Sequence, residues 1–241
     1  MSRIVFQKSY IVLIPSFDKT ATHKHPFMHL FFGKNGCKIT ADKKELQGNI
    51  ILLNSNVKHT VNENNGCDFF LLIDPTSTIA EKILDKYMSG SFYYSITGNI
   101  LNISKNIKNL SDQEIVKVVE NVLLNVGIST EEVSTKDERI EQIIGKIISG
   151  EWLNYSVKKI AELVFLSESR LTHLFKEEVG ISLKSYILIR RMEHAYRLVS
   201  SGGKVTQAAL ESGFASSAHL AYTCKNLTGV SITDVLKKTK N

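Results

Sequence analysis

One eight-residue pattern occurs twice in the C-terminal half of this chain, and it constrains the fold more than any other feature. The first copy is KEEVGISL at 176–183, and the second is KNLTGVSI at 225–232, 49 residues later. Each copy has a glycine directly after an apolar helical pattern. Glycine is typical of helix C-termini because it adopts the positive φ that ends a helix. The repeat therefore predicts two similar helical units.

The residues before each glycine predict a helix, a tight turn and a second helix. In the first unit, residues 156–180, Ser156 precedes the helical run VKKIAELV, FLS forms the turn, and Ser167 precedes ESRLTHLFKEEV. Serine at such positions accepts a hydrogen bond from a first-turn N–H. In the second unit, residues 205–229, VTQAALES, GFAS and SAHLAYTCKNLT follow the same order, and a long helix over 182–201 joins the units. In a helix-turn-helix, the second helix fits the major groove of DNA.

Small and apolar residues are expected to hold each unit together. Ala161 and Ala209 occupy corresponding positions, where two helices approach closely. The side chains expected to face inward are Leu171, Leu174, Phe175, Leu220 and Cys224.

In the first 75 residues the apolar side chains follow a different pattern, which is typical of β-strands rather than helices. Short apolar runs, such as YIVLIP, NIILLN and DFFLLI, alternate with clusters of Gly, Asn, Asp and Lys. This spacing predicts a small antiparallel barrel or sandwich. Beyond Pro75 we expect a helix over 78–88 and a strand in SFYYSIT.

A further helix is predicted from Ser111, which forms a capping box with Glu114, to Gly127. Its apolar stripe comprises Ile115, Val118, Val119, Val122, Leu123 and Val126. The stripe packs either on the chain's own sheet or on a partner helix in a homodimer, and the sequence leaves both open. Polar residues 128–138 predict a linker between an N-terminal domain, 1–127, and a C-terminal domain, 139–241.

Composition argues against a membrane protein and favours a reducing compartment. No apolar run approaches the roughly 20 residues of a membrane helix, and three cysteines without a CxxC pair favour a reducing cytoplasm. The net charge is +6. Most of the excess lies in residues 136–241, with 16 Lys and Arg against 11 Asp and Glu, which is compatible with nucleic-acid binding.

About 100 C-terminal residues resemble the DNA-binding domain of the AraC/XylS family of transcription regulators. The resemblance rests on an ordered set of motifs: the alanine of each first helix, LFK with Gly180, the Y…RRM…A pattern of the connecting helix, GF, and the second lysine and glycine. It implies an α+β protein with two domains. The C-terminal domain would be all-α, with two helix-turn-helix units joined by a long helix.

The resemblance also implies which residues contact double-stranded DNA. The base-contacting residues would be Ser169, Thr172, His173, Ser217, Ala218, Ala221 and Tyr222. The backbone-contacting residues would be Arg170, Lys176 and Lys225. The sequence departs from the family at Tyr222, Cys224 and Ile232, where arginine, phenylalanine and proline are usual. Since alanines offer only methyl groups, the second unit is expected to contact fewer bases.

The N-terminal part, roughly residues 3–75, resembles a cupin barrel, the sensing domain of many family members. The motifs are HKHPFMHLFFGKNG and GNIILLNSNVKHTVN. His23, His25 and His59 match the histidine positions of metal-binding cupins, and His29 occupies the acidic position. These imidazoles structure the strand ends, contact an effector in a pocket, or bind zinc, copper or nickel. We expect no metal and no other cofactor.

The favoured function is a cytoplasmic, sequence-specific transcription activator that binds promoter DNA and contacts RNA polymerase. Its N-terminal domain would sense a small-molecule effector, form a homodimer, or both. The alternative is a metal-dependent cupin enzyme with an appended helical domain, which lacks its acidic ligand here. A repair protein with a methyl-accepting cysteine is a third hypothesis, and no cysteine has the required setting. We therefore expect no enzymatic activity.

Overall fold

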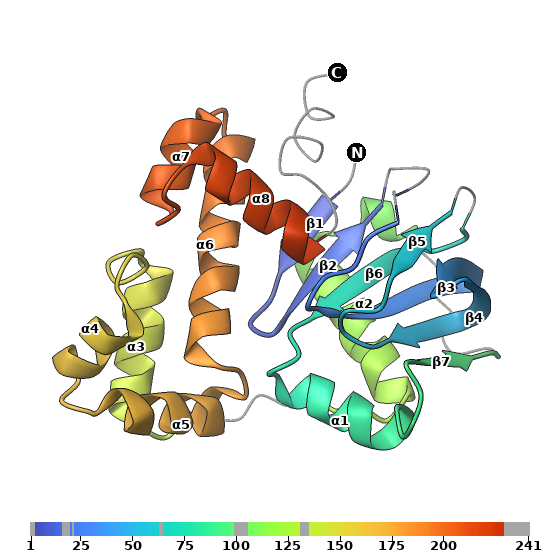
Figure 1. The fold of residues 1–241 in the computed structure, drawn as a ribbon, viewed down its shortest axis with the longest axis horizontal. Helices are drawn as coiled ribbons and strands as arrows, with labels where there is room; N and C mark the ends of the chain where they lie inside the picture. Colours follow the sequence, from blue (N-terminus) through green and yellow to red (C-terminus); the bar gives the residue numbers. More distant parts are fainter. Residues whose placement is uncertain are drawn as a thin grey trace.

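The computed structural model describes residues 3–15, 20, 22–62, 65–98, 106–130 and 135–228. In Figure 1 an antiparallel sheet and two α-helices form the N-terminal region, and a set of helices forms the C-terminal region beside it. Within the described residues, no helix is both long enough and apolar enough to cross a lipid bilayer.

The N-terminal sheet is antiparallel throughout its described pairings. Its strands are β1 (Arg3–Phe6), β2 (Tyr10–Ile14), β3 (Met28–Ala41), β4 (Lys44–Leu53), β5 (His59–Val61), β6 (Phe69–Ile73) and β7 (Tyr93–Ile96). The order is β1-β2-β6-β3-β4-β7, and β5 pairs with β3. The predicted strands are confirmed. Closure into a barrel is not observed in the described residues, where β1 and β7 form the two ends of the order.

Strands β3 and β4 form a long hairpin that changes direction partway along. The β3–β4 register shifts between Phe32 and Cys37. Before the shift β3 also pairs with β6, and after it β3 pairs with β5. A bulge of this kind bends a strand and increases its twist. The bend lets one strand join two different neighbours along the same edge.

Both faces of the sheet are buried. Val12 and Leu30 belong to one apolar cluster, whereas Ile11 and Phe31 belong to another. Because successive strand residues point to opposite faces, neighbouring positions separate in this way. Burial on both faces explains why the strands are continuously apolar rather than alternating.

Two helices cover the first face. They are α1 (Thr78–Tyr87) and α2 (Asp112–Asn125), and a short 3₁₀ turn, η1 (Ile107–Asn109), precedes α2. Ser77 caps α1, and Ser111 with Glu114 forms the predicted capping box of α2. The predicted helix over 78–88 is therefore confirmed to within one residue.

The apolar stripe of α2 packs on this sheet, which corrects one of the two interpretations left open by the sequence. Five of its six residues are at most 5% exposed, namely Ile115, Val119, Val122, Leu123 and Val126. They share a cluster with Val12, Leu30 and Leu71, and the half-buried Val118 packs against it. The stripe thus belongs to the core of its own chain, and assigning these side chains to a dimer contact is wrong.

The C-terminal region is helical, as predicted. Its helices are α3 (Glu138–Ile148), α4 (Val157–Leu163), α5 (Glu168–Val179), α6 (Leu183–Ser200), α7 (Val205–Glu211) and α8 (Ser217–Thr228). Asp137 caps α3, at the end of the predicted linker 128–138. Residues 131–134 of that linker, and Gly229 to Asn241 with the closing glycine of the second unit and Ile232, lie outside the described residues.

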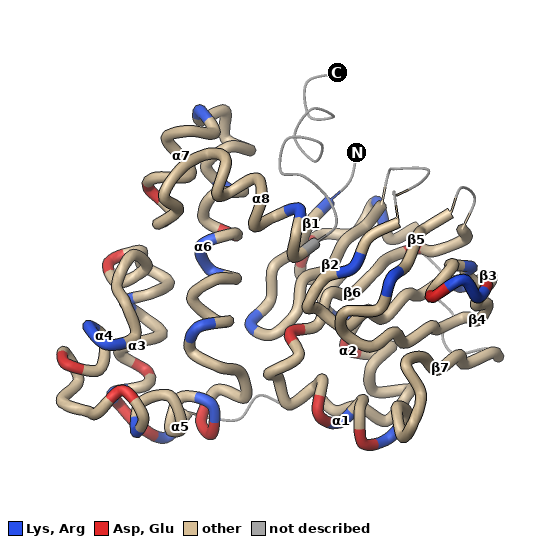
Figure 2. The backbone as a smooth tube through the Cα atoms, viewed as in Figure 1, with Lys and Arg blue, Asp and Glu red and all other residues tan. Residues whose placement is uncertain are grey.

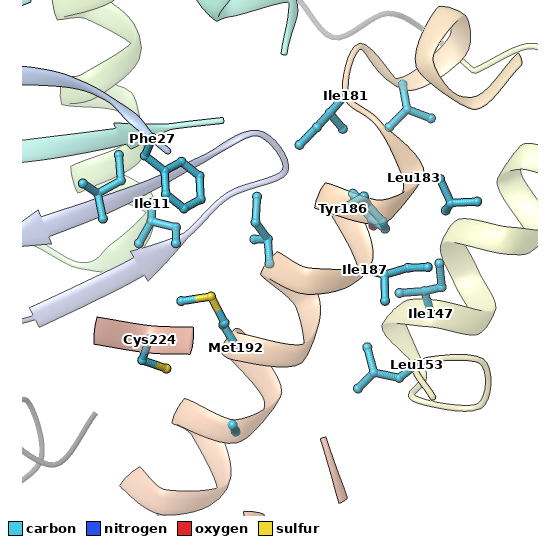
Figure 3. Close-up of a cluster of buried hydrophobic side chains, with 14 of the residues drawn as sticks. Ile11, Phe27, Ile147, Leu153, Ile181, Leu183, Tyr186, Ile187, Met192 and Cys224 are labelled. Atoms are coloured by element: carbon cyan, nitrogen blue, oxygen red, sulfur yellow. The ribbon is translucent and has the colours of Figure 1, made fainter. Parts of the chain in front are cut away.

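The second face of the sheet shares its core with these helices. One apolar cluster includes Ile11 and Phe27 on the sheet side together with Met192 of α6 and Cys224 of α8. Figure 3 shows Ile11 and Phe27 directed toward α6, with Cys224 beside Met192. At the edge of this contact, the rings of Phe6 and Tyr196 are 5.7 Å apart.

Hydrogen bonds also join the regions where α5 ends. The Thr78 N–H donates to the Gly180 carbonyl at 2.8 Å, and the Ser182 N–H donates to Thr76 Oγ1 at 3.1 Å. Gly180 has φ +77°, and a Cβ added there would lie 3.0 Å from Thr78 Oγ1. Glycine at position 180 thus allows the positive φ that ends α5, and its lack of a side chain leaves room for the close approach of α1.

Replacing Gly180 by alanine tests this contact. A left-handed alanine costs roughly 1–2 kcal/mol, and the crowding against Thr78 adds to it. Gly90→Ala is the matched control, because Gly90 has φ +74° with nothing within 4 Å of an added Cβ. We expect urea unfolding to show a larger stability loss for G180A than for G90A. Equal losses would mean that the contact with α1 contributes nothing.

Candidate nucleic-acid interface

The first helix-turn-helix unit forms as predicted from local signals. Ser156 accepts a hydrogen bond from the Lys159 N–H at 3.1 Å, and Ser167 accepts one from the Arg170 N–H at 3.2 Å. Ala161 is 2% exposed. Phe165 in the turn has φ +57° and is 93% exposed. The turn therefore holds a large apolar side chain in water, which packing within the chain does not explain.

Helix α5 separates an inner from an outer face. The predicted inward residues Leu171, Leu174 and Phe175 are buried. On the outer face Ser169, Arg170 and His173 are exposed, and Thr172 is half-buried. The Thr172 hydroxyl donates to the Ser169 carbonyl at 2.9 Å. Its methyl group and oxygen lone pairs are left for outside contacts.

Lys176, at the C-terminal end of α5, is held by the N-terminal region. Its Nζ lies 2.6 Å from Glu81 Oε1 of α1, in an ion pair whose side chains are 42% and 49% exposed. Figure 2 shows acidic and basic positions interspersed on both helices. The pairing is a feature that sequence reasoning missed, and no local signal links residues 95 positions apart.

The second unit repeats the layout with different supports. Ala209 is fully buried, and Phe214 of the turn is 3% exposed. Gly213 has φ +79°, and an added Cβ would lie 2.9 Å from Arg191 Nε. Ser216 accepts a hydrogen bond from the His219 N–H at 3.0 Å, in the capping position that Ser167 has in the first unit.

Helix α8 has few polar side chains at its predicted base-contacting positions. The predicted inward residues Leu220 and Cys224 are buried, and burial raises the pKa of the Cys224 thiol to about 12. Ala218, Tyr222 and Lys225 are exposed, with Tyr222 at 69%, whereas Ser217 and Ala221 are half-buried. Lys225 is the one lysine, arginine, aspartate or glutamate in this helix. The four predicted base-contacting positions thus offer one phenol, one hydroxyl and two methyl groups, and the helix also exposes His219 and Lys225.

Helix α6 ties the two units together, and its contacts give physical reasons for the RRM motif. Arg191 Nε donates to the Leu153 carbonyl, ahead of α4, at 2.8 Å. His194 Nδ1 lies 2.9 Å from Ser212 Oγ, at the end of α7. Met192 is buried in the core shared with the sheet. One helix therefore fixes both units relative to each other.

The predicted histidines lie together in the N-terminal region. Ring centroids are 4.4 Å apart for His23 and His59, 4.5 Å for His25 and His29, and 4.4 Å for His29 and His59. Burial, with smaller effects from neighbouring imidazoles, lowers the pKa of His25 to about 3 and moves the pKa of His29 well below its usual value. Burial likewise lowers the pKa of His59 to about 4. These three rings are therefore neutral at pH 7.

The cysteines do not have the setting of a reactive nucleophile. Cys37 is fully buried and donates to the Gly48 carbonyl at 3.3 Å. The Cys67 thiol is hydrogen-bonded to Cys37, and this bond together with burial raises its pKa. A reactive cysteine needs a lowered pKa.

Comparison with known proteins identifies the C-terminal part. Residues 160–238 match a family described as a helix-turn-helix domain. An uncharacterized HTH-type transcriptional regulator of Staphylococcus aureus is 26% identical over 165 residues, which cover 67% of this chain and 22% of that protein. A probable transcriptional regulator of Photobacterium leiognathi, LumQ, is 32% identical over 98 residues, covering 40% of this chain and 37% of LumQ. The chain thus spans well under half the length of these relatives.

Two solved structures are also similar. ToxT from Vibrio cholerae aligns over 98% of this chain and 99% of its own, with 16% identity and a TM-score of 0.49. An AraC-type DNA-binding domain from Chromobacterium violaceum aligns over 43% of this chain and 94% of its own, with 22% identity and a TM-score of 0.38. The first two relatives are both described as transcriptional regulators.

The ion pair of Lys176 leads to a prediction. If Lys176 contacts phosphate, Glu81→Gln should strengthen non-specific DNA binding, because the lysine no longer has a competing carboxylate. The slope of log K against log salt should steepen by about 1. Binding of a random duplex across a salt series measures it.

Asp85→Asn is the matched control, since it removes the other acidic charge of the same helix. Equal effects of the two variants would show that general charge, rather than release of Lys176, changes DNA binding. No effect of either would contradict the assignment of Lys176 to the DNA backbone.

Proposed function

We propose that this chain, whose residues 160–238 match a helix-turn-helix domain family, is a sequence-specific DNA-binding transcription activator of the AraC type. The observation that carries the proposal is the pair of helices α5 and α8, each with an exposed outer face and both held by α6. Residues 139–241 act as the DNA-binding domain, and residues 1–127 act as the sensing domain.

The length of α6 supports binding along one side of the duplex. Its 18 residues span about 27 Å at 1.5 Å per residue. Successive major-groove segments on one face of DNA are roughly 34–36 Å apart. With α5 and α8 at its two ends, α6 holds the recognition helices at a separation of that order. Ser169, Thr172 and His173 contact bases from α5, and Ser217, Ala218, Ala221 and Tyr222 do so from α8.

Backbone contacts come from Arg170, Lys176 and Lys225. They supply affinity without sequence information, whereas the base contacts supply specificity. Activation requires a further contact with RNA polymerase at the promoter, in the cytoplasm.

A cleft between the two regions supports the sensing role. It has a volume of about 620 Å³ and is lined by the β1–β2 turn, α3 and α6. Phe6, Ile144 and Ile148 supply apolar walls, Lys8 supplies a cation, and Glu141 is the one carboxylate among the lining residues. Arg190 also lines the cleft and is paired with Glu193 at 2.7 Å. Arg190 donates to the Gln7 carbonyl at 2.6 Å, while its buried Nε has no partner among the described residues. The lining suits an amphiphile with an anionic head, and such an effector touches both regions at once.

Selection of random duplex DNA by the full-length chain tests the DNA-binding function. We expect one or two enriched major-groove half-sites, with affinity falling steeply as salt rises. The double variant Thr172→Ala and His173→Ala should weaken binding to the selected site at least tenfold, since each lost base contact costs roughly 1–3 kcal/mol. Its binding to random duplex should stay near that of the parent chain.

Thr206→Ala with Gln207→Ala is the matched control, because it changes two exposed polar residues of α7, the helix outside the groove. Retained specific binding in the α5 double variant, or no enrichment with or without the effector, would contradict the base assignments. With the selected site upstream of a core promoter, increased run-off transcription supports activation, and decreased transcription contradicts its sign. A palindromic motif would indicate a homodimer.

Thermal unfolding with a long-chain carboxylate tests the effector class. A ligand at 100 times its Kd stabilises the folded chain by about 2.7 kcal/mol. We expect the carboxylate to raise Tm, its methyl ester to raise Tm less, and Lys8→Ala to reduce the difference. Lys24→Ala, an exposed lysine elsewhere, is the control. No stabilisation by any amphiphile would exclude this class of effector.

A further inference from the structure

The four clustered histidines are held in place by backbone structure. The His23 N–H donates to the His59 carbonyl at 3.0 Å, and the His59 N–H donates back to His23 at 2.9 Å. This isolated antiparallel bridge fixes the two residues face to face. His25 follows two residues later, and His29 lies in β3. The cluster is therefore built into the fold by two segments whose histidines are 30 to 36 positions apart in the sequence.

The ring nitrogens converge. One ring nitrogen each from His23, His25 and His59 lies within 4.8 Å of the other two. Nitrogen ligands 2.0–2.1 Å from a tetrahedral zinc ion are about 3.4 Å apart. Binding one ion would therefore draw these nitrogens together by up to about 1.4 Å. The geometry is thus close to that of a three-ligand metal site.

The tautomer of His59 is set by its surroundings. Its Nδ1 lies 2.9 Å from the Val57 carbonyl, and a carbonyl can only accept. A neutral His59 therefore has its proton on Nδ1 and a free lone pair on Nε2. Metal-binding histidines commonly have this arrangement, in which the second nitrogen donates to a carbonyl that orients the ring.

His25 lacks the partners that a structural histidine needs. Both its ring nitrogens, and Nδ1 of His29, are buried without a hydrogen-bond partner among the described residues. His25 is 2% exposed and His29 is 4% exposed. Leaving a buried polar group unpaired costs roughly 1–3 kcal/mol. An apolar residue would stabilise the fold more, so the rings need another explanation.

We propose that His23, His25 and His59 bind one transition-metal ion, with a fourth position left for water or a ligand donor atom. Neutral imidazoles suit Zn²⁺, Cu²⁺ and Ni²⁺, whereas Mg²⁺ and Ca²⁺ require oxygen ligands. His29 packs against His25 and His59 and positions their rings. The ion site lies in the N-terminal region, and its existence does not depend on the DNA-binding function.

Metal titration of the full-length chain, first stripped with a chelator, tests the site. We expect one Zn²⁺ per chain, competition by Ni²⁺ and Cu²⁺, and no uptake of Mg²⁺. His25→Leu and His59→Leu should each weaken Zn²⁺ binding at least tenfold. His219→Ala, which removes an exposed imidazole from α8, is the matched control and should leave binding unchanged.

The thermal stability of the metal-free variants gives a second measurement. The substitution that weakens Zn²⁺ binding is expected to leave the metal-free Tm unchanged or to raise it. Because His25 is buried without partners, H25L should have a Tm equal to or above that of the metal-free parent chain, while losing the Tm increase caused by Zn²⁺. His23 is half-buried, so His23→Ala is the substitute variant if the changes at the buried His25 or His59 prevent folding. Less than a tenth of an equivalent of Zn²⁺ bound, or binding unchanged in H25L, H59L and H23A, would overturn the proposal.

Discussion

The buried contact between the second face of the sheet and helices α6 and α8 is the constraint on which the rest of the structure depends. The other face is already covered by α2, so the sheet has no exposed apolar side once the helical region is in place. The second unit has little core of its own, because α8 buries only Leu220 and Cys224 among its described residues. Moving α8 away from the sheet would expose Ile11, Phe27 and Met192, which the hydrophobic effect opposes.

This contact makes the position of the DNA-binding helices a property of the whole chain. The end of α5 is bonded to α1 through Gly180 and Thr78, and Lys176 pairs with Glu81. The proposed effector cleft contacts α6 from the β1–β2 turn. An effector in that cleft would contact α6, and a duplex would contact α5, which directly precedes α6 in the chain. Both ligands would therefore act on this connected pair of helices. Coupling between two sites requires such a shared element, whose position both ligands bias.

Local signals explain why the helical units were predictable. Ser156, Ser167 and Gly180 act on backbone groups within a few residues of themselves, so their effect can be inferred without tertiary structure. The capping box of α2 is predictable for the same reason. The histidine positions were found through the resemblance to a cupin motif, and their unpaired nitrogens became evident only from burial.

Long-range features were not predictable in this way. The ion pair between Glu81 and Lys176 joins exposed residues that carry no periodic signal. The apolar stripe of α2 would show the same sequence pattern whether it packed on its own sheet or on a partner chain. An apolar helix face does not specify which surface covers it. The bend of β3 depends on which neighbours are available along its edge.

The two recognition helices differ in chemistry, and this difference constrains what DNA the chain can bind. Helix α5 presents Arg170 and His173 with the hydroxyls of Ser169 and Thr172, which can donate to bases and phosphates. At its four proposed base-contacting positions, helix α8 presents two methyl groups, one hydroxyl and one phenol, so these contacts depend more on thymine methyl groups and groove shape. Its attachment to the sheet through Cys224 also limits its adjustment to different sequences. Under the proposed function, a binding site for this chain would therefore need one well-defined half-site opposite α5 and would tolerate more variation opposite α8.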